Sequence, residues 1–87
     1  MIMLNKENNY VEWVLLMVNL EDTQEHIANL IDELHDRGYI DEVDFKIQIA
    51  HIYGHLNRIY YSRNHIGEIS SEQWQQYSRF PTDIEPI

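Results

Sequence analysis

The chain contains no cysteine, which excludes disulfides, zinc–thiolate sites and thiol catalysis. Glycine and proline are scarce, with three and two copies. Because these residues interrupt regular structure, their scarcity favours long, uninterrupted helices. Basic residues are also few, with six against fifteen acids and a formal net charge of −9. This balance argues against direct binding to bare nucleic acid, since phosphate contacts need a basic surface.

Long hydrophobic runs are absent too. The most apolar stretch, residues 14–18, is far too short to span a bilayer. The first residues do not pair a basic segment with a long apolar run, so we expect no signal peptide. These absences favour a cytoplasmic protein without membrane contact. The hydrophobic share of 44% nevertheless argues against disorder, and 87 residues predict a single domain over residues 1–80 with a flexible tail at 81–87.

Helix boundaries are signalled clearly in the sequence. We predict helices at about residues 9–37, 42–66 and 71–79. Glycines follow the first two, and capping residues precede each of them. The predicted N-caps are Asn9, Asp41 and Ser70.

Two of these N-caps have a partner three residues later, the spacing of a capping box: Asn9 with Glu12, and Ser70 with Gln73. Asp22 and Glu25 repeat this spacing inside the first helix. The sequence therefore leaves open whether that helix continues past Asp22 or restarts there.

The fold class that follows is all-α. The loop between the first two helices is short, and short loops join antiparallel neighbours, so we expect a long antiparallel helical hairpin plus a short third helix. Apolar residues at helical spacing predict the packed faces. On the first helix these are Trp13, Leu16, Leu20, Ile27, Leu30, Ile31 and Leu34, and on the second Phe45, Ile49, Ile52 and Leu56.

The second helix carries another stripe on its opposite side, with the alternating four- and three-residue spacing of a heptad seam. We call it the second stripe: Val43, Ile47, Ala50, Gly54, Asn57 and Tyr61. The first helix has surplus apolar residues at the same end of the hairpin: Val11, Val14, Leu15 and Val18. We expect these ten residues to form an interface with an identical chain, giving a four-helix-bundle-like homodimer. The alternative is that the third helix covers the second stripe.

Charge is distributed unevenly along the chain. Between residues 21 and 44 there are nine acids and one base, whereas residues 45–67 contain no acid. The hairpin tip collects an acidic surface: Asp32, Glu33, Asp36, Asp41, Glu42 and Asp44. Such a surface either keeps the protein soluble or docks a basic protein partner.

Motifs for chemistry are few. His51 and His55 lie one helical turn apart, a spacing that can hold zinc, but the glutamate of a metalloprotease motif is missing. A third ligand would have to come from the first helix or another subunit, with His26, Glu25 and Glu12 as candidates. We favour polar edge residues over a metal site, and expect no cofactor. No glycine-rich phosphate loop or paired catalytic carboxylates are evident, so we expect no enzyme.

The sequence therefore predicts a small, acidic, non-enzymatic interaction module of the adaptor, inhibitor or immunity kind. Two alternatives stay open. One is an acidic mimic of nucleic acid that blocks a nucleic-acid-binding protein. The other is a helical bundle that binds metal through histidines and carboxylates.

Overall fold

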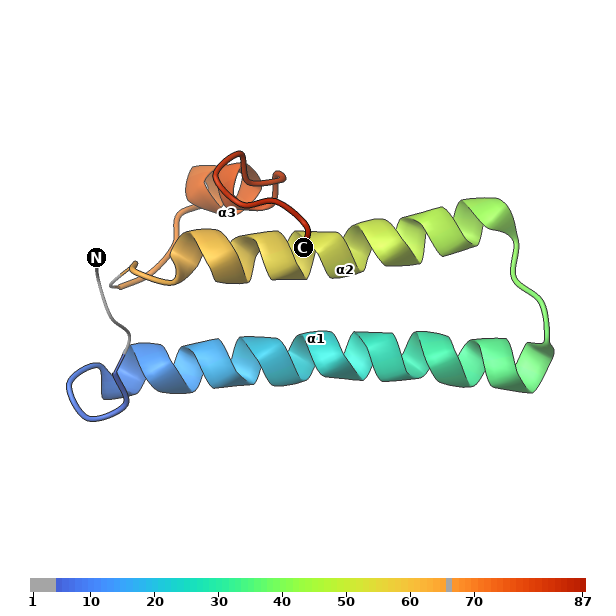
Figure 1. Cartoon of the computed structure of the whole chain (residues 1–87), viewed down its shortest axis with the longest axis horizontal. Helices are drawn as coiled ribbons and strands as arrows, with labels where there is room; N and C mark the ends of the chain where they lie inside the picture. Colours follow the sequence, from blue (N-terminus) through green and yellow to red (C-terminus); the bar gives the residue numbers. More distant parts are fainter. Residues whose placement is uncertain (1–4, 66) are drawn as a thin grey trace.

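The computed structural model describes residues 5–65 and 67–87, and over these residues the regular structure is entirely helical. The helices are α1 (Tyr10–Arg37), α2 (Glu42–Ser62) and α3 (Ser71–Tyr77). The all-α prediction is confirmed. α1 and α2 lie side by side and are joined at one end by residues 38–41, while α3 lies on the side of α2 away from α1 (Figure 1).

All three helices begin directly after their predicted N-cap residues, and the N-cap side chain makes its hydrogen bond in α2 and α3. Ser70 and Gln73 form the complete capping box of α3, and the Asp41 side chain accepts a hydrogen bond from the backbone N–H of Val43. The predicted capping box of α1 is wrong, because Asn9 makes no side-chain cap. Asn5 forms the local turn instead, accepting a hydrogen bond from the Glu7 N–H at 2.7 Å.

α1 runs without a break through Asp22, which settles the question of a restart. It ends at Gly38, whose φ of 71° lets its N–H bond to the Leu34 carbonyl. α2 ends at Ser62, earlier than the predicted end at residue 66. There the chain tightens into a turn, with the His65 N–H donating to the Ser62 carbonyl at 2.9 Å.

The packed face of α1 differs from the one predicted. Among the described residues, Leu30 is the one buried apolar side chain, and the other buried residues are the polar Thr23 and Asn57. The covered positions of α1 are Glu12 and Trp13 near its start and Leu16, Thr23, His26, Leu30 and Glu33 further along, and those of α2 include Gln48, Ile52, His55 and Ile59. We call the last five residues of α1 and these four residues of α2 the α1–α2 seam. Contacts across it, such as Glu33 with Gln48 and His26 with His55, show that α1 is rotated toward its polar side.

Six residues of the predicted packed faces are consequently exposed: Leu20, Ile27, Ile31, Leu34, Phe45 and Leu56, each 37–48% accessible. The predicted packed faces are therefore only partly confirmed, because the residues of these faces that are covered are Trp13, Leu16, Leu30, Ile49 and Ile52. Polar residues enter the seam because each finds a partner. Thr23, for example, donates its hydroxyl to the Asn19 carbonyl at 2.8 Å, and no buried side-chain polar atom of the described residues lacks a partner.

α3 is held against α2 by polar and aromatic contacts. The Asn57 amide donates to the Ser78 carbonyl at 2.9 Å, and Arg58 donates to the Ser78 hydroxyl at 2.7 Å. The Arg58 guanidinium also lies 4.3 Å from the centre of the Trp74 ring, a cation–π distance. Asn57 is buried, so its bond to Ser78 is the central anchor of this packing.

We predict that Asn57→Ala loosens α3, because it removes a buried hydrogen bond and leaves the Ser78 carbonyl without its partner. The loss should be about 1–3 kcal/mol in unfolding free energy. Urea unfolding followed by Trp74 fluorescence in a Trp13→Phe background measures it. The matched control is Asn29→Ala, an exposed asparagine within α1, which should leave stability unchanged or slightly raised. Equal effects of both changes would contradict the anchoring role.

Candidate functional site

The first notable surface is the set of six exposed apolar side chains, which we call the apolar flank: Leu20, Ile27, Ile31, Leu34, Phe45 and Leu56. They recur at helical spacing on α1 and α2 and border the α1–α2 seam. Isolated exposed apolar residues are ordinary on soluble proteins. Six such residues at helical spacing on two neighbouring helices are a candidate binding surface, because exposed apolar patches are typical of such surfaces.

The second stripe is divided between two environments. Asn57 and Tyr61 bond to the chain that follows α3, the latter through its hydroxyl to the Phe80 carbonyl at 3.2 Å. Gly54 lies beside the Arg58 side chain. Val43 and Ile47, nearer the α1–α2 connection, are each 61% exposed. The third helix and its following segment thus cover one half of the stripe and leave the other half open.

The surplus residues of α1, Val11, Val14, Leu15 and Val18, are all exposed. Two of them, Val11 and Leu15, line a cavity of about 590 Å³ at the open end of the pair, together with Ser62, His65 and Ile69. The loop after α2 forms its other wall. These four residues therefore stand on a different part of the surface from Val43 and Ile47, which lie toward the connected end.

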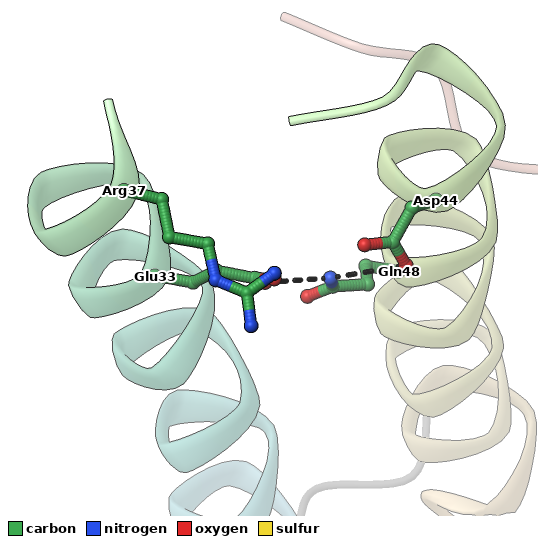
Figure 2. Close-up of polar contacts among 4 residues, drawn as sticks. All are labelled: Glu33, Arg37, Asp44 and Gln48. Atoms are coloured by element: carbon green, nitrogen blue, oxygen red, sulfur yellow. Dashed lines mark hydrogen bonds and ion pairs between the residues drawn. The ribbon is translucent and has the colours of Figure 1, made fainter. Parts of the chain in front are cut away.

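Some acidic residues of the hairpin tip make contacts within the chain, and others are exposed to solvent. Figure 2 shows the Gln48 amide between two carboxylates, donating to Glu33 at 2.8 Å and to Asp44 at 3.4 Å. Arg37 lies 3.4 Å from Glu33 within α1. Asp41 caps α2. The acids of this surface that lie fully exposed are Asp32, Asp36, Asp41 and Glu42.

We predict that Gln48→Glu weakens the pairing of α1 and α2 by about 1–3 kcal/mol at neutral pH, because it places a third carboxylate between Glu33 and Asp44. The penalty should shrink near pH 4, where carboxylates take up protons. Urea unfolding at both pH values tests this. Gln76→Glu adds the same charge at an exposed position of α3, and a loss of stability no larger than that control's would refute the bridging role.

Three histidines meet at the middle of the pair. His26 comes from α1, and His51 and His55 come from successive turns of α2. One ligand nitrogen from each lies within 4.8 Å of the others. The ring centres are 4.6–4.7 Å apart. Of the three candidate third ligands named from the sequence, His26 joins the pair. Glu25 and Glu12 are not among the grouped residues.

The protonation of this trio follows from its geometry. The Nε2 atoms of His51 and His55 are 3.1 Å apart, a hydrogen bond that requires an N–H on one ring and a lone pair on the other. Burial lowers the pKa of His55 below its usual value, and the charges of Arg58, His51 and His26 lower it further, while Asp22 acts the other way. At least one imidazole of the trio is therefore neutral near neutral pH.

Comparisons with known proteins assign no relative to this chain: no family model, no curated protein and no solved structure matches it. Among the described residues, no helix combines the length and the apolar character needed to cross a membrane.

Proposed function

We propose that this protein is a small, acidic, non-enzymatic interaction module of the adaptor, inhibitor or immunity kind, and that it works as a homodimer joined through the apolar flank. The observation that supports this most directly is the exposure of all six flank side chains, while Leu30 is the one apolar residue buried among those that the structure describes. Burial of apolar area is the main driving force of association, so a surface of this kind favours a partner.

The total exposed area argues for the same conclusion. A compact monomer of 10.5 kDa exposes about 5,400 Å², whereas this chain exposes 7362 Å². Its radius of gyration of 15.2 Å likewise exceeds the roughly 12 Å of a compact domain of this length. The excess of about 2,000 Å² is more than the roughly 800 Å² that each partner buries in a standard interface.

The flank is arranged to receive another pair of helices. Residues advance by about 100° along a helix, which puts Ile27, Ile31 and Leu34 to one side of Leu30, and Phe45 and Leu56 to one side of the seam on α2. In an antiparallel hairpin these two sides fall on the same face of the helix pair. The apolar flank is then one continuous surface across both helices.

A second copy suits this surface better than a charged partner. No acid falls on this face between residues 13 and 34 of α1, and α2 has none from Phe45 onward. The net charge of −9 therefore opposes self-association less here than elsewhere on the surface. Two hairpins packed face to face around a twofold axis form a four-helix bundle with crossings of roughly 20°.

The acidic tip supplies the surface for the protein partner. In the bundle, the exposed acids Asp32, Asp36 and Glu42 lie outside the apolar contact and remain free to meet a basic protein. Binding through these charges should weaken as salt rises, because exposed charges are screened.

We predict that Ile31→Asp converts the dimer to a monomer, because it places a charge in the middle of the apolar contact. Size exclusion coupled to light scattering measures the mass at high micromolar protein. Ile47→Asp is the matched control, since Ile47 is also an exposed isoleucine, at 61% against 48% for Ile31, and lies on the second stripe.

Three outcomes can be told apart. Dissociation by Ile31→Asp alone supports the apolar flank. If Ile47→Asp alone dissociates the dimer, the interface lies on the open half of the second stripe instead. A monomeric wild-type chain removes the homodimer altogether. Circular dichroism of each variant verifies that the helices are retained.

A further inference from the structure

The three histidines lie in the polar part of the molecule, away from the apolar flank. His26, His51 and His55 approach one another from two helices and form a triangle with sides of 4.6–4.7 Å between ring centres. A cavity of about 190 Å³ borders the trio and is lined by His26, His51 and Gln48 with two isoleucines. There is room beside the rings for an ion and a water molecule.

We propose that these three imidazoles bind one Zn²⁺ per chain and leave a fourth position to water. Zinc accepts nitrogen ligands at about 2.0–2.1 Å in a tetrahedron, which sets the nitrogens about 3.3 Å apart. The Nε2 atoms of His51 and His55 are already at 3.1 Å. The other nitrogen–nitrogen distances in the trio are up to 4.8 Å. Rotation of the imidazole rings shortens them by about 1.5 Å to the tetrahedral spacing.

The ligand set selects the class of metal. Imidazole suits zinc and its neighbours copper and nickel, whereas magnesium and calcium require oxygen ligands. The group contains no carboxylate. The negative charge of Asp22, one helical turn before His26, favours a cation beside His55, while the positive charge of Arg58 has the larger effect there and opposes one. The net charge of −9 adds a general attraction.

The arrangement of the trio also prepares it to act as a ligand. A metal needs the nitrogen lone pair, so a protonated imidazole must first lose its proton. The hydrogen bond between His51 and His55 shows that one lone pair is already directed into the space between the rings. Binding therefore replaces one internal hydrogen bond with three metal–nitrogen bonds.

Zinc at this position would link α1 to α2 through the three histidine side chains. A ligand that binds only the folded chain stabilises it by about 2.7 kcal/mol at one hundred times its dissociation constant. The site lies on the side of the helix pair opposite the apolar flank, so it extends the proposed function without depending on self-association. Its stoichiometry is counted per chain in monomer or dimer.

The test is titration calorimetry of Zn²⁺ into the metal-free full chain at neutral pH, in the presence of excess Mg²⁺. We expect one site per chain. His51→Gln removes a ligand whose side chain is exposed, so the helices should be unaffected, and His26→Gln removes the ligand from α1. Even outer-shell changes weaken metal sites by about 10–100-fold, so loss of a direct ligand should cost at least that. His35→Gln, an exposed histidine outside the trio, should bind zinc like the wild type.

A second measurement separates lost binding from lost folding. Zinc should raise the melting temperature of the wild type and of His35→Gln, and should not raise that of His51→Gln or His26→Gln. The proposal is overturned if the wild type takes up no stoichiometric zinc, if Mg²⁺ displaces the zinc, or if His35→Gln weakens binding as much as the trio variants do. Equal zinc affinity of wild type and His51→Gln would overturn it as well.

Discussion

Two helices lying side by side can each bury only a narrow strip, and this constraint governs the whole molecule. A helix becomes largely enclosed when neighbours surround it on several sides. Here α1 is a 28-residue helix, about 42 Å long, with α2 as its one helical neighbour. Leu30 is buried and most other apolar residues are not. The exposed apolar flank, the open cavities and the polar contacts between the long helices all follow from this lack of covering structure.

The residues buried between α1 and α2 are unusually polar, and their polarity restricts how the two helices can pair. Leucine pairs can slide along one another at little cost, whereas hydrogen-bonded side chains meet only at one register. The hydrogen bond from Gln48 to Glu33 and the ring contact of His26 with His55 fix both the rotation and the axial position of α1 against α2. The α1–α2 seam thus buries little apolar area, but it defines one rotation and one axial position of the helices. The apolar residues outside the seam remain free for other contacts.

The sequence predicted the local features of this chain, such as its helix ends. It did not predict how α1 is rotated about its own axis. Gly38, Asp41 and Ser70 mark helix ends through backbone chemistry that depends on neighbouring residues alone. The face that α1 turns toward α2 depends on long-range pairing. Hydrophobic periodicity favoured Ile27 and Ile31 there, whereas in the structure Glu33 and His26 contact α2, through Gln48 and His55.

The candidate histidine site, too, could be predicted only in part from the sequence. The spacing of His51 and His55 could be seen in the sequence, and His26 was one of three possible partners from α1. Choosing among them required the register of the two helices, which places His26 beside the pair. The role of α3 was also undecided, because a short helix with two aromatic residues can cover many surfaces. Its bonds from Asn57 and Arg58 to Ser78 fix its place.

The attachment of α3 to α2 alone has a consequence for how the chain opens. Because α3 makes no contact with α1, it can detach while the two long helices remain paired. The molecule therefore consists of two units of different local stability, and amide protons of α3 exchange with solvent before those in the middle of α1 and α2. Each detachment uncovers Asn57 and Tyr61, so the part of the second stripe that α3 and its following segment cover becomes accessible in a minor state of the folded protein.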